Sequence, residues 1–497
     1  MTAMTALKRD IHPALGYLSD GRLLREFAYI DGRWTQALDA ASFEVRDPFS
    51  GQVLAHVASL GADDATRAVD AAARALCAWQ TLAPQERAAR LRAWYDLVCA
   101  AREDLALLMT LEQGKPLDES RGEIDYAASF IEWYAEEAKR LNAEGVTSHL
   151  PGAQMLVSRE PLGVAGLLTP WNFPSAMVTR KAAAALAAGC TVVIHPSSYT
   201  PLSALALAEL AERAGIPAGV FNVVTGQAQP IAQRLCEDSR VRVMSFTGST
   251  EIGRLIAQQC SSTVKRLIME LGGNAPLIVF DDADLDRAVG IAMDAKFATS
   301  GQDCLAANRI YVQRALYPAF CEALARRVAA LKVGCGLEPG VQIGPLMHEH
   351  AVARTEARIE DALLRGARRL AGGAPAPGPR FVMPTLLADV PDDAAIMQEE
   401  AFAPVACITP FDGEEEVVAR ANATEYGLVA YVITDNCARA LRMSRALEYG
   451  MVAVNRVKLT GAPIPFGGVK QSGMGREGSR QGLEAFTDLK YTCLDLA

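Results

Sequence analysis

Between residues 163 and 272 the sequence alternates between short, continuous apolar runs and longer stretches with helical periodicity. The apolar runs are rich in β-branched residues and read GVAGLLTP, TVVIHP, GVFNVVTG, VRVMSFTG and KRLIMELGG. A strand that is apolar along its whole length is typical of a parallel sheet covered by helices on both faces. This segment therefore predicts a doubly wound α/β fold of the kind that binds dinucleotides.

The sequence before residue 140 is mainly helical after a short strand-like start. Apolar residues recur with helical spacing from residue 61 to 79, and Asp63 or Asp64 is the expected N-cap. A second helix is predicted from Pro84, a residue type that suits the first helical position, and a third from Ile124 to Ala138.

A second series of strands and helices begins at APLIVF, residue 275, and continues to about residue 455. It is interrupted by AGGAPAPGPRF, whose glycines and prolines predict a surface loop. A chain of 497 residues is too long for one ordinary core, so two α/β domains with a cleft between them are expected. Such clefts commonly hold ligands.

Composition argues against several classes of protein. The formal charge is −9 and no cluster of Lys or Arg stands out, so neither nucleic acid nor an anionic membrane is expected as a partner. The sequence shows no signal-peptide pattern and no apolar stretch long enough to span a bilayer. The eleven cysteines form no Cys-x-x-Cys pair, and LMHEH (346–350) is expected to be a solvated loop. We therefore predict a cytoplasmic protein without a metal.

A glycine-containing segment after one predicted strand is a candidate anion site. FTGSTEIG carries Gly248, Ser249 and Gly253 between the end of the strand and the start of a helix. Free backbone N–H groups and the helix dipole favour a phosphate at such a place. The same residues are equally compatible with an ordinary turn and N-cap, and the usual Gly-x-Gly-x-x-Gly pattern is missing from the first strand–helix turn.

Six segments together resemble the motif set of the NAD(P)-dependent aldehyde dehydrogenase superfamily, in the family's order and over almost the whole chain. They are TPWNFPSAMVTRK (169–181), FTGSTEIG (246–253), MELGGNAP (269–276), GQDC (301–304), EEAFAPV (399–405) and PFGGVKQSGMGREG (465–478). FNVVTG, GREGSRQGLEAF and LKYTCL are most similar to the succinate-semialdehyde dehydrogenase branch of that family.

The resemblance implies a fold of three parts: a Rossmann-type parallel-sheet cofactor domain, an α/β catalytic domain and a small β oligomerisation element. An exposed strand edge in the last part invites subunit pairing, so a homodimer or homotetramer is expected. The expected boundaries are 1–140 and 159–272 for the cofactor domain, 273–455 for the catalytic domain, 141–158 and 483–497 for the oligomerisation element, and 456–482 for a segment that returns to the cofactor domain.

The resemblance also implies a covalent mechanism. Cys304 is implied as the nucleophile, since a thiolate adds readily to a carbonyl and the resulting thioester can be hydrolysed. The side-chain amide of Asn172 and the backbone N–H of Cys304 are implied as donors to the oxyanion, and Glu270 as the base for the deacylating water. Lys181 matches a family lysine near the proton path. Taken singly, the cysteine is compatible with a buried apolar residue, the asparagine with a turn and the glutamate with a solvated strand end.

The cofactor residues implied by the resemblance come from both expected domains. His195 stands where the family usually has a lysine for the adenosine ribose, and a histidine can still donate a hydrogen bond and is partly cationic near neutral pH. Ser198 stands where NAD-preferring members often carry a glutamate, and a serine does not repel a 2′-phosphate. NAD and NADP are both permitted, with a slight preference for NAD or dual use. The implied set is Trp171, His195, Ser198, Gly248, Ser249, Gly253, Leu271, Glu400 and Phe402.

The substrate is less constrained by the sequence. Arg180 matches one of two arginines that hold the distal carboxylate in the succinate-semialdehyde branch, whereas the second would fall at Ala298. Thr460 occupies a position where that branch tends to have a serine. Succinate semialdehyde or a related small semialdehyde is the predicted substrate. A neutral aliphatic or aromatic aldehyde is one alternative, and a catalytically silent binding protein is the alternative from another class.

Two neighbours of the candidate nucleophile also differ from what the family leads one to expect. Ala306 replaces a second cysteine of the branch, so no local disulfide can form with Cys304. Asp303 would oppose formation of the thiolate if its side chain faced the sulfur.

Overall fold

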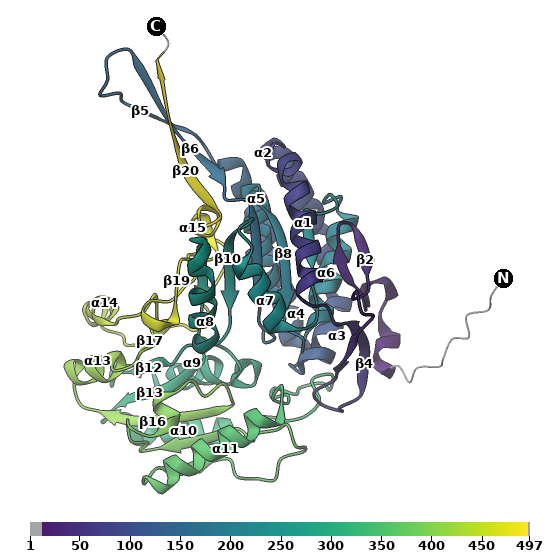
Figure 1. Ribbon diagram of the computed structural model, residues 1–497. Coiled ribbons are helices and arrows are strands. Elements are labelled where there is room, and N and C mark those ends of the chain that lie inside the picture. Colours follow the sequence, from purple (N-terminus) through teal and green to yellow (C-terminus); the bar gives the residue numbers. More distant parts are fainter. Residues whose placement is uncertain (1–11, 496–497) are drawn as a thin grey trace, which may run out of the picture.

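The computed structural model describes residues 12–495, which form two α/β lobes and a projecting β arm (Figure 1). Residues 1–11 belong to the predicted cofactor domain and residues 496–497 to the predicted oligomerisation element; both stretches lie outside the described residues. Among the described residues, no helix is long and apolar enough to cross a membrane.

The first lobe is built on an eight-stranded sheet. In sheet order its strands are β19 (Gly473–Met474), β11 (Arg266–Glu270), β10 (Val241–Thr247), β7 (Val164–Thr169), β8 (Thr191–Pro196), β9 (Phe221–Val223), β1 (Ala28–Ile30) and β2 (Arg33–Thr35). The five central strands are parallel, as their continuous apolar runs predict, and antiparallel strands close both edges. Val192 and Ile194 of β8 enter one core and Val193 enters the core on the opposite face.

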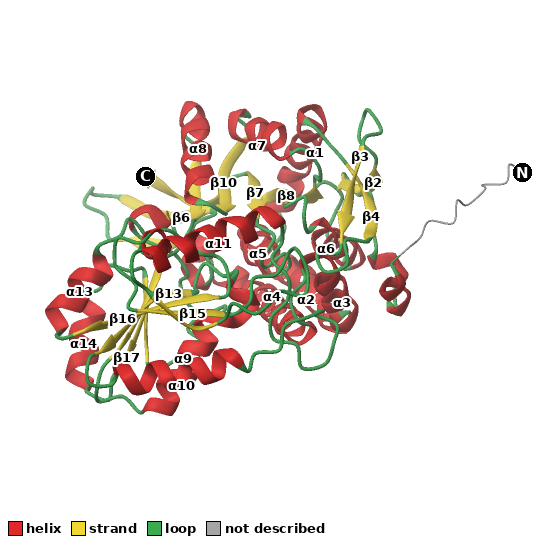
Figure 2. Ribbon diagram, turned by 90° about the horizontal axis from the view of Figure 1, so that it is seen from below, coloured by secondary structure: helices red, strands yellow, loops and turns green. Residues whose placement is uncertain are grey.

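Helices cover both faces of this sheet (Figure 2). One layer consists of α1 (Ala62–Gln80), α7 (Ala228–Glu237) and α8 (Thr250–Cys260). The other consists of α5 (Ala176–Ala188) and α6 (Pro201–Arg213), against which α2 (Pro84–Ala100), α3 (Arg102–Gln113) and α4 (Leu117–Glu137) pack. The helices therefore leave the carboxyl ends of the parallel strands as the open edge of the lobe.

The helix boundaries differ from the sequence prediction at two places. The first helix begins at Ala62 with Gly61 as its N-cap, and Asp64 sits at the third helical position, where its carboxylate accepts the N–H of Gly61 at 3.3 Å. The prediction of Asp63 or Asp64 as the cap was therefore wrong by two or three residues. The start at Pro84 is confirmed, whereas the third predicted helix begins at Leu117 and is preceded by α3.

The second lobe is built on a seven-stranded sheet. In sheet order its strands are β14 (Arg368–Ala371), β15 (Thr385–Ala388), β16 (Val405–Phe411), β13 (Ala307–Gln313), β12 (Ala275–Val279), β17 (Val429–Ile433) and β18 (Met451–Val454). All neighbours are parallel except β14 and β15. Helices α9 (Leu285–Phe297) and α10 (Tyr317–Ala329) cover one face, and α11 (Glu349–Leu364), α12 (Ala395–Gln398), α13 (Glu414–Asn422) and α14 (Cys437–Ala446) cover the other.

The LMHEH segment is not the solvated loop that its sequence suggested. His348 is the N-cap of α11, where its ring nitrogen accepts the N–H of Ala351 at 3.3 Å, and His350 lies within the helix. The predicted Gly/Pro-rich loop, by contrast, follows β14 as a loop.

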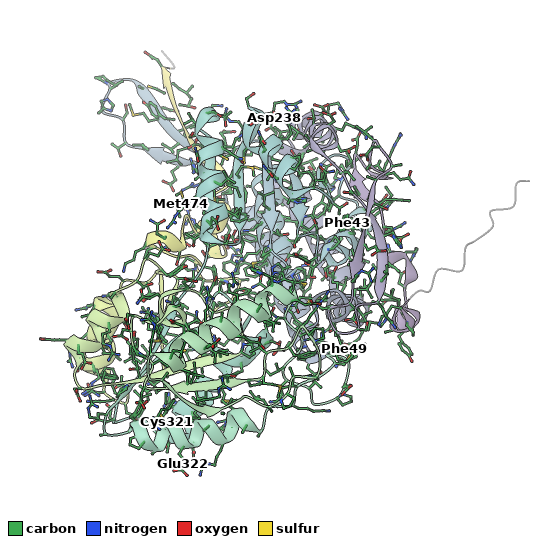
Figure 3. All side chains as sticks on the ribbon, turned by 60° about the horizontal axis from the view of Figure 1, so that its bottom comes forward. Phe43, Phe49, Asp238, Cys321, Glu322 and Met474 are labelled. Carbon is green, nitrogen blue, oxygen red and sulfur yellow. The ribbon has the colours of Figure 1, made fainter. Side chains whose placement is uncertain are left out.

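A three-stranded arm projects from the body of the molecule (Figure 1). Its strands are β20 (Thr487–Asp495), β6 (Ala153–Pro161) and β5 (Glu144–Val146), and α15 (Ser479–Glu484) leads into β20. Before the arm, the chain comes back from the second lobe to the first, where Gly473 of β19 pairs with Glu270 of β11. Figure 3 shows Met474 of β19 at the first lobe and Cys321 of α10 on the far side of the second.

The remaining short elements lie outside these sheets. They are β3 (Ser42–Arg46) and β4 (Val53–Ala58), which form a two-stranded sheet, and the 3-10 turns η1 (Pro13–Tyr17), η2 (Gly21–Leu23), η3 (Ala138–Arg140), η4 (Ser261–Thr263), η5 (Ala298–Gly301) and η6 (Lys470–Ser472).

Candidate active site

A cavity of about 1020 Å³ brings several of the predicted site residues together. Its wall includes residues from the start of α5, from the loop before β13 and from the segment after β18. Among the described residues that line it, none belongs to the predicted cofactor set. The predicted residues in its wall are Asn172, Arg180, Ala298, Asp303, Cys304 and Thr460.

Cys304 lies in a tightly constrained loop between α9 and β13. The backbone of Thr299, Ser300 and Gly301 is left-handed, with φ of 51°, 56° and 69°. A side chain at position 301 is excluded, because a Cβ there would lie 2.3 Å from the carbonyl oxygen of Ala403. The turn that precedes the cysteine therefore packs closely against the backbone of Ala403, in the segment just before β16.

The surroundings of Cys304 favour its neutral thiol. Its partial burial raises the pKa of the thiol, and the carboxyl groups of Asp303 and Glu400 raise this pKa further, while Arg180 acts in the opposite direction. The Asp303 carboxylate accepts the N–H of Leu305 at 2.9 Å, and burial raises its own pKa. The concern that this aspartate opposes formation of the thiolate is thus supported by the structure.

Asn172 is oriented toward the cysteine loop. Its side-chain Nδ2 donates to the carbonyl oxygen of Gln302 at 3.0 Å, and its own carbonyl oxygen accepts from Lys115 Nζ at 2.6 Å. Lys115 in turn forms a buried ion pair with Glu123 at 2.6 Å, and Glu123 accepts the N–H of Ser175 at the start of α5. Sequence reasoning missed Lys115 and Glu123, since both lie on or near α4, 49 to 57 residues before the asparagine.

Glu270 is the last residue of β11 and is almost completely buried. Neither carboxylate oxygen has a hydrogen-bond partner in the described part of the chain. Burial raises the pKa of this carboxyl group well above its ordinary value, and the nearby charge of Glu477 raises it further. A Cβ on Gly467 would lie 2.8 Å from Glu270 Oε1, so the glycine leaves the space that the carboxyl group occupies.

A second buried carboxylate, Glu477, holds the two basic residues of α5 in place. It forms ion pairs with Arg180 at 2.7 Å and with Lys181, and it accepts the hydroxyl of Ser245 at 3.0 Å. Lys181 also donates to the hydroxyl of Thr247 at 2.7 Å. Burial alone would raise the pKa of Glu477, but the two cations outweigh it and hold the pKa below its ordinary value. Glu477 was not predicted, although it lies within the GREG segment that carried the resemblance.

The predicted phosphate cradle lies at the start of α8. Ser249 is the N-cap, and its hydroxyl accepts the N–H of Ile252 at 3.4 Å. Gly253 packs against Leu271, because a Cβ at position 253 would lie 2.4 Å from a methyl carbon of that leucine. The N–H of Gly248 donates to the carbonyl oxygen of Glu270 at 3.1 Å, which joins this turn to the end of β11.

His195 is the fifth residue of β8 and Ser198 follows that strand, and both make hydrogen bonds to nearby backbone carbonyls. The His195 ring nitrogen Nδ1 lies 2.7 Å from the carbonyl oxygen of Val224, and burial lowers the pKa of the ring. The expectation of a partly cationic histidine was therefore wrong, because its surroundings favour the neutral ring. Ser198 donates its hydroxyl to the carbonyl oxygen of Gly226 at 2.8 Å.

The second lobe contributes Glu400 and Phe402 opposite Trp171. One carboxylate oxygen of Glu400 accepts the N–H of Gly273 at 3.0 Å, and burial raises the pKa of the group to about 7. Phe402 has a left-handed backbone, with φ of 50°, and its ring meets that of Trp171 edge to face at 5.5 Å. The two lobes thus meet directly at this aromatic contact.

These residues fit a dinucleotide. The eleven-residue helix α8 presents its first N–H groups next to Gly248, where a Cβ would lie 2.4 Å from the ring of Phe246, and N–H groups at a helix start suit an anionic pyrophosphate. Glu400 keeps one carboxylate oxygen without a hydrogen-bond partner in the described chain, which suits a ribose hydroxyl. Glu270 and Leu271 are adjacent in sequence, so the predicted catalytic and cofactor sets meet where β11 ends.

A model of the aldehyde dehydrogenase family matches residues 34–492 of the chain. The chain belongs to the aldehyde dehydrogenase family. The family suggested by the six sequence segments is thus confirmed, and the protein is an oxidoreductase that uses NAD or NADP.

Individual relatives of this aldehyde dehydrogenase align over nearly their whole length. It is 55% identical over 478 residues to the aspartate-semialdehyde dehydrogenase (non-phosphorylating) of Halomonas elongata, covering 96% of this chain and 97% of the relative. It is 51% identical over 480 residues to the NADP(+) succinate-semialdehyde dehydrogenase of Escherichia coli, covering 96% and 100%.

The fold is equally close to that of a solved structure. The crystal structure of succinate-semialdehyde dehydrogenase from Burkholderia pseudomallei is 48% identical, with a TM-score of 0.96 over 97% of this chain and 100% of that one. The predicted fold class, an aldehyde dehydrogenase-like α/β fold, is therefore confirmed.

Proposed function

We propose that this aldehyde dehydrogenase oxidises a small semialdehyde to the dicarboxylic acid, with succinate semialdehyde as the leading substrate. The observation that carries the proposal is the shared cavity, whose wall contains both Cys304 and the buried guanidinium of Arg180. A semialdehyde needs these two groups in one space, a nucleophile for its carbonyl and a cation for its distal carboxylate. The names of the relatives, which specify succinate and aspartate semialdehydes, support the same class of substrate.

In the first step we assign Cys304 as the nucleophile. The thiol loses its proton to solvent, a C–S bond forms, and the carbonyl π electrons move to oxygen as a thiohemiacetal anion. Asn172 Nδ2 and the Cys304 N–H donate to that anion. Removal of hydride from the carbon re-forms the C=O bond as a thioester, and bound NAD or NADP supplies the acceptor for that hydride.

In the second step we assign Glu270 as the general base. Its ionised carboxylate takes one proton from water while the hydroxide oxygen forms a bond to the thioester carbon. The C–S bond then breaks, the acid leaves, and the Cys304 sulfur departs as a thiolate. The absence of hydrogen-bond partners on both oxygens of Glu270 in the described chain supports this role, since no protein donor occupies the lone pairs that would accept the proton.

For the cofactor we propose NAD or dual use of NAD and NADP. Ser198 brings no negative charge that would repel a 2′-phosphate, which permits NADP. His195 is buried, and burial lowers its pKa and so favours the neutral ring, which brings no positive charge that would favour NADP. Comparison of kcat/KM for the two dinucleotides tests this, and a preference for NADP of more than about tenfold contradicts it.

The substrate proposal is tested with succinate semialdehyde and butanal, a neutral aldehyde of the same chain length. We expect the semialdehyde to have the larger kcat/KM by at least about tenfold. A larger value for butanal would favour the alternative, an enzyme for neutral aldehydes. The silent binding protein predicts no reduced nicotinamide with any aldehyde and either dinucleotide.

We further propose that the enzyme is a cytoplasmic homodimer or homotetramer that pairs through the β arm. Several large apolar side chains are exposed on this arm, which is unusual for a surface that faces only water. They are Val146, Leu150, Leu156, Leu489 and Tyr491.

A further inference from the structure

The cavity that contains Cys304 is lined by four lysine and arginine side chains among the described residues. Three of them are already neutralised by a carboxylate. Lys115 pairs with Glu123 at 2.6 Å, Arg140 with Glu137 at 2.7 Å, and Arg180 with Glu477 at 2.7 Å. Their charges are therefore largely compensated before a substrate arrives.

Lys458 is the fourth, and it differs from the others. Its side chain is exposed, and no carboxylate of the described residues lies within 4.0 Å of its amine. Its neighbours Val457 and Leu459 pack against the core of the second lobe, which anchors the backbone on either side of the lysine. An anchored backbone places the amine at the cavity with little freedom of the main chain.

The acidic residues of the same wall are mostly engaged elsewhere. Asp125 pairs with Arg102 at 2.6 Å, and Glu132 pairs with Arg92 at 2.9 Å. Asp294 is exposed and has no ion pair among the described residues. Lys458 is thus the uncompensated cation that an anionic group entering this cavity can use.

Position 298 makes room for such a group. Ala298 is exposed in the same wall, and its methyl side chain brings neither charge nor a hydrogen bond. A carboxylate that lies near it must take its second cation from another part of the wall, because Arg180 already shares its charge with Glu477.

We propose that Lys458 contacts the distal acid group of the substrate and is a specificity-determining residue of this enzyme. The proposal rests on the proposed function, oxidation of a semialdehyde. Lys458 and Arg180 then contact the distal carboxylate from two sides of the cavity, while the aldehyde carbon lies at Cys304.

The test compares Lys458→Gln with the parent chain on succinate semialdehyde and on butanal. We expect the ratio of the two kcat/KM values to fall by about tenfold, mainly through a higher KM for the semialdehyde. Lys458→Arg should keep most of the ratio, since it keeps the positive charge. Arg456→Gln is the matched control, because Arg456 is an exposed cation of the same loop that does not line the cavity.

Ionic strength gives a second readout. Because the contact is between exposed charges, added salt should lower the ratio for the parent chain and change it little for Lys458→Gln. An unchanged ratio in Lys458→Gln, or an equal fall in Arg456→Gln, overturns the proposal for Lys458. A parent chain that oxidises butanal but not the semialdehyde overturns the proposed function instead, so the two failures are distinguishable.

Discussion

Cys304 and Glu270, the proposed nucleophile and base, both lie where their uncharged forms are favoured. The same burial that disfavours the thiolate also removes water, and a thiolate formed there is a stronger nucleophile than one in bulk water. The positive charge of Arg180 lowers the pKa of both groups, against the burial that raises it. Burial thus favours the uncharged thiol and carboxyl group before reaction, while Arg180 favours the charged forms that the reaction needs.

Replacement of the sulfur tests the covalent step. Cys304→Ser should lower kcat by a factor on the order of 10³ or more, because a serine hydroxyl ionises far less readily than a thiol and is the weaker nucleophile. Dinucleotide binding, followed by fluorescence titration, should be retained. Cys437→Ser is the control, since Cys437 is an exposed cysteine of the same lobe. A full rate in Cys304→Ser would contradict the mechanism.

The raised pKa of Glu270 gives the pH dependence a definite sign. A carboxyl group with a raised pKa is protonated at low pH and gains its base form only as pH rises through that pKa. When deacylation limits turnover, kcat should therefore rise with pH, by up to about tenfold per pH unit below the pKa.

Glu270→Gln removes the titrating group and should abolish that rise. The thioester should then accumulate, so a rapid-mixing experiment should record a burst of one reduced nicotinamide per active site before a slow phase. A variant with the parent's pH profile and no burst would assign the base to another residue.

Residue-scale prediction from the sequence was strongest where a short segment carries its own signal. GQDC and MELGG place the cysteine after a constrained turn and the glutamate at a strand end, and the structure has these features. Lys115 and Glu123 lie in no such segment, and Glu477 lies in one without a pattern that marks its role. Each also contacts a residue that is remote in sequence, with a separation of 57 residues from Lys115 to Asn172 and of 296 from Lys181 to Glu477, and only the folded chain brings these together.

At the scale of elements, the start of α5 is the best-supported helix terminus of the site. Glu123 of α4 accepts the N–H groups of Ser175 and Ala176 at 2.9 and 3.1 Å and also pairs with Lys115. One carboxylate thus satisfies the first turn of α5 and holds the lysine that supports Asn172. The position of Asn172, the proposed oxyanion donor, therefore depends on packing between two helices.

Glu123→Gln should destabilise the protein by about 3–5 kcal/mol, because it leaves the charge of Lys115 buried without its ion-pair partner. Urea unfolding measures this, and kcat should fall as well, since the Asn172 backbone loses its support. The double variant Lys115→Met/Glu123→Gln should be less destabilised than the single one.

The control is an ion pair at the surface. Glu322 of α10 pairs with Arg326 at 2.9 Å, and both side chains are 71% exposed; Figure 3 shows Glu322 at the outer face of the second lobe. Glu322→Gln should change the free energy of unfolding by less than about 0.5 kcal/mol. Equal changes in the free energy of unfolding for Glu123→Gln and Glu322→Gln would contradict a special contribution of the buried pair to stability.

Element types were more predictable than element ends. Continuous apolar runs correctly indicated the parallel strands β7, β8 and β10, because burial on both faces leaves a clear pattern. The antiparallel edge strands and α3 left weaker patterns, and the Gly61 cap has no side chain by which it could be recognised. His195 was misjudged for a similar reason, as the carbonyl of Val224 lies on a different strand-to-helix connection.

At the scale of the whole molecule, the arm is the feature that a monomer does not explain. Leu489 and Tyr491 share one face of β20 and are 61% and 56% exposed. Light scattering should give a mass of two or four times the 53.1 kDa of one chain. Leu489→Asp with Tyr491→Asp should reduce that mass, whereas Lys490→Gln, on the opposite face of the same strand, should not. A parent mass of one chain would contradict the oligomer.

The two-lobed plan was predictable from length and from the two series of strands and helices. How the lobes are joined was not. Between β11 and β12 the chain passes from one sheet to the other through residues 271–274, and Ser472 holds this connection by accepting the N–H of Leu271 at 3.0 Å and donating its hydroxyl to Gly272 at 2.6 Å. Ser472 lies 200 residues from Gly272, so no local sequence pattern predicts this contact.

The separation of the cavity wall from the cofactor set has a kinetic consequence. On the proposed roles, the aldehyde lies in the cavity whose wall includes residues of α4, whereas the dinucleotide lies at the start of α8. Because the two proposed sites are separate, neither reactant blocks the entry of the other, and the acid can leave while the reduced dinucleotide is still bound. The order of release is then set by how tightly each product is held and not by which one blocks the exit.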